Sequence, residues 1–535
     1  MITETLQATR TQSGLSEYTG SWGLAEVRHL LRRTMFGAAQ ADITYFSQKT
    51  MSQAVDELLS VSSTAPSPPV NNYNNGRVTD PDISFGDTWV NGPDNAALYG
   101  ARTNSLKAWW AGLMINQDRS ILEKLTLFWH NHFSTEITVY RDPIYGYNHL
   151  AMLRANAMGN FKSLVKSVTL DPAMLNYLNG QRNTKNAPDE NYARELQELF
   201  TLGKGPDSQY TEEDVRQAAK VLTGWRINRT NYTSYFLPNQ HDSGDKTFSS
   251  FYGDQVINGQ AGADGANELD SLLDMIFAEE EVAKYVCRRL YRWFVYYDID
   301  SGVETDVIEP LAQIFRNANY NIKPVLEALF KSEHFFDVAN RGCVIKSPID
   351  YIMGLIRQTD IVLPDSSKLE EQYYFWQIAY QVCAGQQQNL LDPPNVSGWP
   401  AYYQIPQFHE IWVNTDTLPN RNQISDILII AEVKYKNETM KIDAIRVAEL
   451  FDNPGSPTAL INDWVNYFYT LDVSSDQKEY MKSLLLSGQT KDSYWTDAWD
   501  AYQADPTNQV KRDTVRLRLM SLLKYVLNLA EHQLS

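Results

Sequence analysis

The stretch from Asp189 to Trp225 carries the side chains whose types and spacing are best suited to chemistry. It predicts two helices joined by a glycine-rich turn. At about 100° per residue, Glu195 falls on the same side of the first helix as Leu199 and Leu202. Glu198 lies at the edge of that side, so we predict an i, i+3 pair of carboxylates that faces the interior or a cleft. Three neighbours are predicted to point the other way: Arg194, Gln197 and Thr201.

Carboxylates that face inward need partners, because an unpaired ionised group in an apolar environment either costs several kcal/mol or takes up a proton. One interpretation is a structural ion pair with an arginine of a neighbouring helix, for which the basic patch at 28–33 is a possible source. The other interpretation is a metal site or an acid–base site. The choice depends on which other side chains meet Glu195 and Glu198.

Two imidazoles at the end of a predicted helix are the first candidates to meet these acids. They belong to the tripeptide His-Asn-His at 130–132. If the helix continues through the tripeptide, only His132 faces inward. If the chain becomes extended before it, His130 and His132 share one face, which is the usual geometry of an H-x-H pair of metal ligands. With Glu195 and Glu198, these histidines predict a site for Zn, Fe or Mn.

A further group of candidate residues lies in the turn-forming segment NQHDSGDKTF. It contains His241 and Asp242, with Lys246 close behind, and loops of this kind often carry functional residues on a rigid scaffold. In a metal-free version of the site, Glu195 with a raised pKa is the general base. Lys246 or Arg194 then binds an anionic group of the substrate.

The composition limits the partners of this chain. It has 47 Lys and Arg against 65 Asp and Glu, a formal net charge of −18. Nucleic acids and anionic membranes are bound through clustered Lys and Arg, so neither is expected as a partner. No run approaches the roughly 20 apolar residues of a membrane helix, and the N-terminal residues lack the features of a signal peptide. Three widely spaced cysteines predict neither a disulfide framework nor a cysteine zinc site.

The pattern of apolar residues predicts a mainly α-helical protein. A polar lead is expected over residues 1–20, followed by a single large helical domain over 21–535. Within that domain, the Ser, Pro, Asn and Gly residues of 61–95 predict a flexible surface loop. The Thr, Tyr and Asn residues of 226–260 predict a small β-hairpin excursion. A final amphipathic helix over 510–529 is expected to pack against the body.

Several motifs together resemble one bacterial family, the domain of unknown function 1800. They are RHLLRRTMFG at 28–37, FWHNHF at 128–133, PDENYARELQELFTLG at 188–203, YTEEDVRQAAKVLTGW at 210–225, HDSGDK at 241–246, KSPIDY at 346–351 and PPNVSGW at 393–399. The resemblance spans nearly the whole chain and implies no established activity. The positions that match the family pattern and carry polar or aromatic groups are His130, His132, Glu190, Asn191, Arg194, Glu195, Glu198, His241, Asp242, Lys246, Asn395 and Trp399.

The resemblance also implies a partner. Genes of this family often neighbour those of a second family, the domain of unknown function 1501, which is similar to alkaline phosphatases and sulfatases and commonly bears a twin-arginine export signal. A protein without its own signal peptide is then expected to stay in the cytoplasm or to be exported together with that partner.

Two functions therefore stay open at this point. The first is an enzyme, a hydrolase or an oxidoreductase, with a divalent metal held by His130, His132, Glu195 and Glu198, or with the metal-free site described above. The second is a non-catalytic binding or co-export partner of the phosphatase-like protein, in which the same histidines and acids form a polar network that fixes the core.

Overall fold

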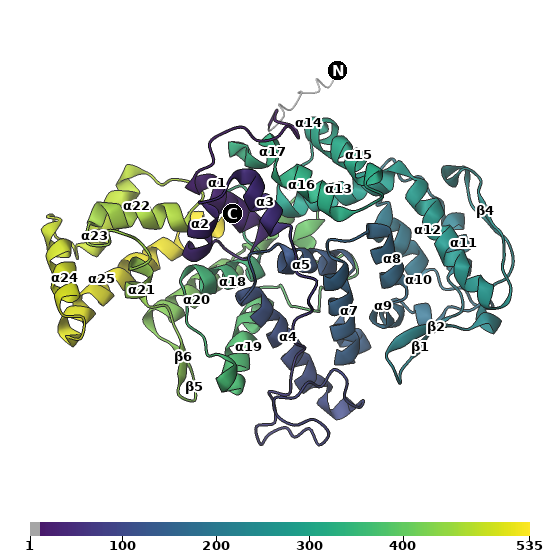
Figure 1. Cartoon of the computed structure of the whole chain (residues 1–535), viewed down its shortest axis with the longest axis horizontal. Helices are drawn as coiled ribbons and strands as arrows, with labels where there is room; N and C mark the ends of the chain where they lie inside the picture. Colours follow the sequence, from purple (N-terminus) through teal and green to yellow (C-terminus); the bar gives the residue numbers. More distant parts are fainter. Residues whose placement is uncertain (1–10) are drawn as a thin grey trace.

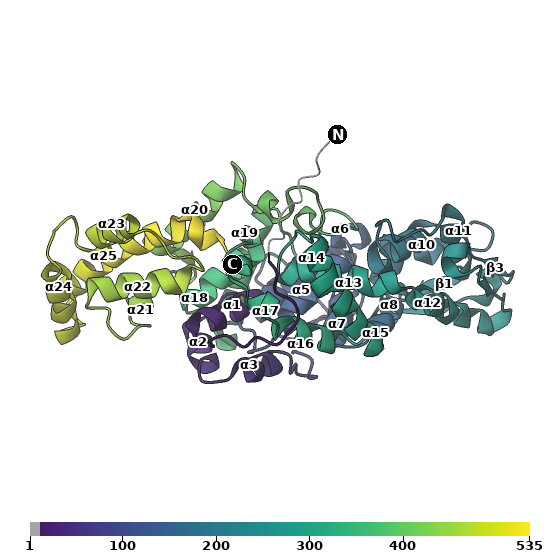
Figure 2. The ribbon, with the colours of Figure 1, turned by 90° about the horizontal axis from the view of Figure 1, so that it is seen from above.

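The computed structural model describes residues 11–535 and is built mainly of α-helices, as predicted. Figure 1 shows these helices in a broad fan, and Figure 2, turned by 90°, shows that the fan is shallow. The helices that lie towards the middle of the fan are α1 (Leu24–Thr34), α2 (Gln40–Phe46), α3 (Met51–Leu58), α4 (Tyr99–Ile115), α5 (Leu122–His132), α6 (Ile137–Tyr140), α7 (Pro143–Asn156), α16 (Ile322–Phe330), α17 (Glu333–Phe336), α18 (Pro348–Gln358), α19 (Leu369–Gly385) and α20 (Thr417–Ile430).

The fan continues on both sides of this middle part (Figure 1). The helices towards the right of the view are α8 (Phe161–Thr169), α9 (Pro172–Tyr177), α10 (Asn191–Glu195), α11 (Glu212–Val221), α12 (Glu268–Ala278), α13 (Glu280–Phe294) and α15 (Glu309–Asn317), and α14 (Ser301–Val303) lies at the top, above α16. Those on the left are α21 (Ala444–Ala448), α22 (Pro457–Phe468), α23 (Ser475–Leu485), α24 (Ser493–Ala504) and α25 (Gln509–Asn528). Among residues 11–535 no helix combines the length and the apolar composition needed to cross a bilayer.

Strands are few and form antiparallel two-stranded hairpins. The predicted excursion is present as two of them, β1 (Trp225–Asn228) with β2 (Thr233–Phe236) and β3 (Lys246–Thr247) with β4 (Val256–Ile257). A third hairpin, β5 (Val433–Tyr435) with β6 (Glu438–Met440), was not predicted. Its strands have only three residues each, too short for an alternating pattern to stand out.

The core is built around helices that are covered on all sides. Every residue of α5, LEKLTLFWHNH, is buried. Helix α4 packs against α19, α18 and α7, and α5 packs against α7. An inner helix of this kind has no solvent face, so its polar side chains must find partners inside the protein.

Both ends of the described chain pack on the body. Residues 1–10 of the predicted polar lead lie outside the described residues, whereas Tyr18 donates its main-chain N–H to the carbonyl of Lys331, 2.8 Å away. Helix α25 contacts α20 to α24. The expected packing of the final amphipathic helix is thus confirmed, with Leu519, Leu522 and Val526 among its fully buried residues.

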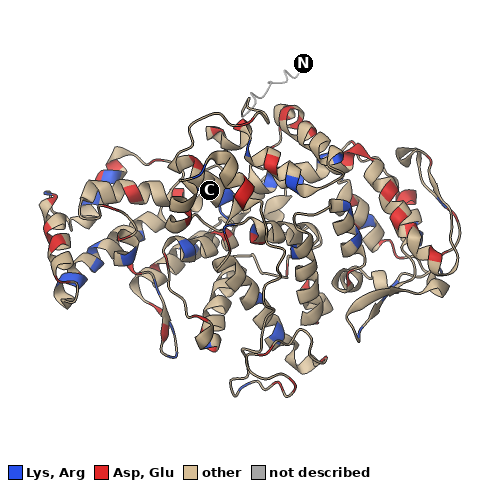
Figure 3. Ribbon diagram, viewed as in Figure 1, with Lys and Arg blue, Asp and Glu red and all other residues tan. Residues whose placement is uncertain are grey.

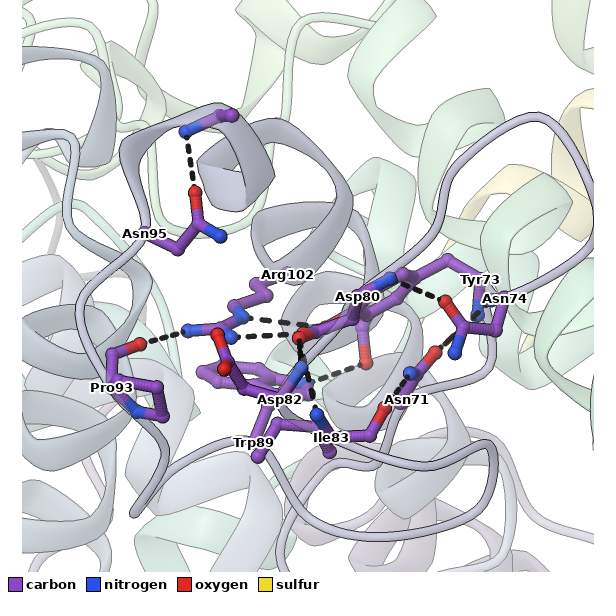
Figure 4. Close-up of polar contacts among 12 residues, drawn as sticks. Asn71, Tyr73, Asn74, Asp80, Asp82, Ile83, Trp89, Pro93, Asn95 and Arg102 are labelled. Atoms are coloured by element: carbon purple, nitrogen blue, oxygen red, sulfur yellow. Dashed lines mark hydrogen bonds and ion pairs between the residues drawn. The ribbon is translucent and has the colours of Figure 1, made fainter.

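A buried ion pair organises the long loop over 61–95 (Figure 4). Asp80 Oδ2 lies 2.8 Å from Arg102 Nη2 of α4, and the two side chains are 0% and 1% exposed. The same carboxyl group accepts hydrogen bonds from the Tyr73 hydroxyl and from the main-chain N–H of Asp82 and Ile83. Burial raises the pKa of Asp80, but the bonds from Arg102, Asp82 and Tyr73 outweigh it and leave this pKa below its usual value.

Asparagine side chains replace the missing regular structure of this loop (Figure 4). Asn71 accepts from the main-chain N–H of Tyr73 and Asn74, and Asn74 accepts from that of Asp80 at 2.6 Å. Trp89 is fully buried and donates to the Ser105 hydroxyl, 3.1 Å away. The loop is therefore held to α4 by polar contacts of its own and by one aromatic anchor.

We expect Asp80→Asn to loosen this loop, because the substitution leaves the Arg102 guanidinium buried without an opposite charge. Breaking a buried pair in this way costs about 3–5 kcal/mol. Trypsin should cut faster after Arg77, which is exposed in the same loop. In the wild type, the loop should become equally easy to cut only at acid pH, because Asp80 takes up a proton as the pH falls through its lowered pKa.

The matched control is Asp87→Asn, which makes the same change in charge at an exposed position of the loop. Cutting rates after Arg77 that are equal for Asp80→Asn and Asp87→Asn would show that the ion pair does not hold the loop.

Candidate functional site

The helix that carries the predicted carboxylates changes its winding at the first of them. Helix α10 ends at Glu195, and the next residues, Leu196–Thr201, form a π-helical turn. Such turns are rare and occur frequently at functional sites. Gln197 and Thr201 are fully buried in this turn. The prediction that they point away from the interior is wrong, because a wheel drawn at the α-helical angle does not describe a π turn.

The main-chain carbonyls of the π turn are held by side chains from elsewhere. His132 Nε2 lies 3.0 Å from the carbonyl oxygen of Phe200, and the Tyr285 hydroxyl donates to that of Leu199 at 2.8 Å. Gly203 follows the turn with a φ of +78°, and a Cβ there would come within 2.6 Å of the Tyr285 ring. The glycine in the predicted turn is thus required both by its conformation and by the close approach of Tyr285.

Glu195 has no hydrogen-bond partner among the described residues. Its side chain is half-buried, and its Oε2 atom is fully enclosed. Burial raises the pKa of Glu195, and the nearby charge of Glu198 raises it further, against smaller opposing effects of Lys204 and Arg194. Glu195 therefore favours the protonated state more than an ordinary glutamate does.

The other charged residues of this segment are already paired. Glu198 binds Lys204, whose side chain is 73% exposed. Arg194 lies 2.7 Å from Glu212 and 3.1 Å from Glu190. Glu212 belongs to α11, whose acidic first turn lies at the edge of the molecule (Figure 3). Arg194 thus joins α10 to α11 through a structural ion pair. Among the described residues neither Glu195 nor Glu198 is paired with an arginine, so the ion pair of the first interpretation is not found.

Two residues of α13 that the sequence did not single out border the same turn. Burial raises the pKa of Tyr285. The charges of Arg289 and Arg292 lower it, and those of Glu198 and Glu195 raise it. Arg289 is half-buried, and it makes no hydrogen bond or ion pair within residues 11–535. The only signal in the sequence is the i, i+4 spacing of Tyr285 and Arg289, which places them on one helix face.

The two predicted histidines lie on different sides of α5. The helix continues to His132, so the alternative in which both rings share an extended face does not occur. Burial lowers the pKa of His132 to about 3, with a contribution from Arg289. The ring is neutral at pH 7 and donates to the carbonyl of Phe200. The contact of His132 with the π turn is therefore to a main-chain carbonyl. The ring has no hydrogen bond or ion pair with a carboxylate among the described residues.

His130 points into an aromatic enclosure. Its ring lies 5.1 Å from the Trp110 ring and 5.6 Å from the Trp399 ring, measured between centroids. Neither ring nitrogen has a hydrogen-bond partner in the described structure. Burial lowers the pKa of His130 well below its ordinary value, and the charges of His149 and Lys107 add to this. The expectation that His130 points away from the core in a continuous helix is wrong, because α5 is buried on both faces.

The residues of the 241–246 segment form a separate, closed network. His241 Nε2 lies 3.0 Å from Glu268 Oε1, and Lys246 Nζ lies 2.6 Å from Glu268 Oε2. All three side chains are at most 2% exposed. Asp242 lies outside the triad, and its carboxylate accepts the N–H of Gly244. This network fixes the β excursion to the start of α12 and leaves no open side for a substrate.

The predicted site residues are therefore distributed over three places. Arg194, Glu195 and Glu198 lie on α10 and the π turn that follows it, and His132 contacts this turn. His130 lies next to Trp399. The residues of the 241–246 segment surround Glu268. Within residues 11–535, no group of three or more His, Cys, Asp or Glu side chains is arranged to hold a metal ion. The donor set does not fit the expected Zn, Fe or Mn site, and we derive no step through such an ion.

One sequence family matches nearly the whole chain. The profile of a family described as "Protein of unknown function (DUF1800)" matches residues 29–534. The chain belongs to this family. Comparisons with curated proteins and with solved structures give no match.

The structure explains two of the family motifs that lie far apart in the sequence. Asn131, the asparagine of FWHNHF, accepts the main-chain N–H of Trp399 at 2.8 Å. A Cβ on the preceding Gly398, whose φ is +89°, would come within 2.3 Å of the Asn131 side chain. The motif PPNVSGW thus needs its glycine so that Trp399 can close over His130.

We expect Glu268→Gln to destabilise the protein strongly, because it leaves the ammonium group of Lys246 buried without an opposite charge. The loss is about 3–5 kcal/mol in the free energy of unfolding, measured by urea denaturation. The control is Glu213→Gln, which removes a pair whose side chains are each 51% exposed. That loss should stay below about 1 kcal/mol. Similar losses for the two variants would contradict the structural importance of the buried network.

Proposed function

We propose that this protein is a metal-independent enzyme in which Glu195 is the general base. The observation that carries the proposal is a half-buried carboxylate on a π turn that has no hydrogen-bond partner among residues 11–535. An unpaired buried carboxylate lowers the stability of the fold, and natural proteins retain such groups mainly where they serve a function.

The raised pKa of Glu195 suits proton transfer. A base works best when its pKa lies near the working pH, and burial together with Glu198 moves Glu195 in that direction. The partly exposed side chain leaves the carboxylate within reach of a bound molecule. The reaction classes that follow are abstraction of a proton from a substrate and activation of a water for hydrolysis.

Arg289 is the group that we propose to bind an anionic substrate near the π turn. Lys246 is enclosed with Glu268, and Arg194 is bound to Glu190 and Glu212, so neither of the cations proposed from the sequence is available. Arg289 keeps its guanidinium unpaired within the described residues, near Tyr285 on the border of the π turn. A free guanidinium binds carboxylate or phosphate groups in two-point contacts.

The second function, association with a phosphatase- or sulfatase-like protein, remains a prediction from the family resemblance. Co-purification of the two proteins from one host would support it. That role and catalysis at Glu195 are compatible, because the π turn occupies only a small part of the helical surface.

The pH dependence of stability tests the state of Glu195 without a known substrate. Since its folded-state pKa lies above its unfolded-state pKa, the wild type loses stability as the pH rises through the interval between the two values. Glu195→Gln removes this loss. We expect the variant to be more stable than the wild type at pH 7 and equal to it near pH 4, measured by thermal unfolding at both pH values.

The matched control is Glu198→Gln, one turn away, which releases Lys204 instead. Glu198→Gln also removes the charge of Glu198 that acts on Glu195. Any gain in stability that grows with pH should be no larger than this effect. An advantage of Glu195→Gln that is equally large at pH 4 and pH 7 would show that the pKa of Glu195 is not raised.

Catalysis is tested by untargeted mass spectrometry of small anionic metabolites incubated with the protein. Compounds that the wild type consumes should persist with Glu195→Gln, and Arg289→Gln should slow their consumption mainly through a higher KM. Arg216→Gln, an exposed arginine paired with Glu213, is the control for the loss of one positive charge. Equal consumption by the wild type and Glu195→Gln would exclude Glu195 as the base.

A further inference from the structure

An apolar pocket lies between α4, α5, α7 and the first residues of the long loop, in the middle part of the fan (Figure 1). Its volume is about 240 Å³. An apolar cavity of about 150 Å³ holds one benzene molecule, so this pocket has room for about ten non-hydrogen atoms. Large apolar side chains of its lining include Trp109, Trp110, Leu113, Tyr147, Leu150 and Met158. A pocket with this lining suits a small, mainly apolar molecule.

The loop closes one side of this pocket and is fixed there. Val61 and Pro66 belong to the lining, and Trp109 Nε1 donates to the carbonyl of the following Ser67, 2.7 Å away. Trp109 itself is 6% exposed, and its ring lies 5.8 Å from that of Tyr147, measured between centroids. The aromatic wall is therefore held in place by contacts within the protein, and a ligand does not have to order it.

Among the described residues, Arg154 is the charged side chain that lines this pocket. Its Nε atom lies 2.7 Å from Glu123 Oε1, whereas its two Nη groups have no partner within residues 11–535. One side of the guanidinium is thus open to a second acceptor. The protein already contains an arginine of this kind, since Arg288 binds Glu281 and Glu304 at the same time. A carboxylate can bind the Nη groups of Arg154 in a two-point contact.

The open side of Arg154 is largely shielded from the solvent. The side chain is 16% exposed, and apolar surroundings strengthen a hydrogen bond to a charged group. The half-buried Tyr147 makes no hydrogen bond among the described residues, and burial raises the pKa of its hydroxyl. This hydroxyl therefore stays protonated and is a second donor at the pocket. The lining combines apolar walls with one charged and one neutral donor.

We propose that this pocket binds a small aromatic carboxylate, with its ring against Trp109 and Tyr147 and its carboxylate on the Nη groups of Arg154. Aromatic rings in contact attract each other beyond the burial of their apolar area. A cation is disfavoured, because the described lining contains a guanidinium and no acid. The proposal is independent of the function proposed for Glu195, because none of the described lining residues belongs to α10 or to the π turn.

Isothermal titration calorimetry with phenylacetate, which matches the size of the pocket, tests this site on the full chain. We expect saturable binding of one molecule per chain and a rise in Tm. Phenylacetamide has the same shape without the charge and should bind about tenfold more weakly, because the charged hydrogen bonds are lost. Octanoate has the carboxylate without the ring and should bind severalfold more weakly. Equal affinity for phenylacetamide would overturn the role of Arg154, and equal affinity for octanoate would overturn the aromatic preference.

Two variants locate the site. Ala151→Leu enlarges a lining residue of α7 and should weaken phenylacetate binding about tenfold or more, because the new side chain occupies part of the pocket. Arg154→Lys keeps a positive charge beside Glu123 but removes the two-point contact. It should weaken the binding of phenylacetate severalfold and leave the affinity for phenylacetamide nearly unchanged. A merely structural effect would weaken both ligands alike.

The matched control is Ala501→Leu, which makes the same change at an exposed position of α24 and should bind as the wild type does. Circular dichroism shows whether each variant is folded, and Ala151→Leu serves if Arg154→Lys does not fold. Absence of saturable phenylacetate binding in the wild type, or wild-type affinity in both pocket variants, would overturn the proposal.

Discussion

The constraint on which the rest of this structure depends is the complete burial of helix α5. An inner helix without a solvent face can satisfy its polar side chains only from within the protein, and in the described structure His130 is an exception that has aromatic neighbours instead. Glu123 pairs with Arg154, Lys124 with Asp350, and Asn131 with the main chain of Trp399. These contacts connect α5 to α7, to α18 and to the segment that follows α19, so the polar residues of one helix determine how distant parts of the chain are assembled.

The π turn after Glu195 depends on the same helix. His132 uses its ring to bind a carbonyl that an unbroken α-helix would have satisfied by itself. The irregular winding thus requires a neutral, buried imidazole, and burial provides it by lowering the pKa of His132. Buried acids such as Glu268 and Asp80 are ion-paired, whereas the carboxylate of Glu195 has no hydrogen-bond partner among the described residues. Packing alone does not require an acid at this position.

The sequence was sufficient for the fold class, for the hairpins of 226–260 and for the packing of the last helix, because each depends on a local period of apolar residues. It was not sufficient for the orientation of individual side chains. Gln197 is buried because the helix changes its winding, and His130 is buried because Trp399 closes over it from about 270 positions away. The spacing of residues along the chain predicts neither the π turn nor the contact with Trp399. The absence of a partner for Arg289 within residues 11–535 is likewise a property of the assembled protein, since any of the 65 acids of the sequence could have met it.

Helix α13 connects the π turn electrostatically to the buried helix α5. Tyr285 donates to the carbonyl of Leu199 in the turn, and Arg289 follows it about one helical turn further along. The charge of Arg289 helps to lower the pKa of Arg292 and contributes to the lowered pKa of His132. An anion bound next to Arg289 would oppose these positive charges. The neutral state of His132, on which the π turn depends, is therefore maintained by a charge on α13 as well as by burial.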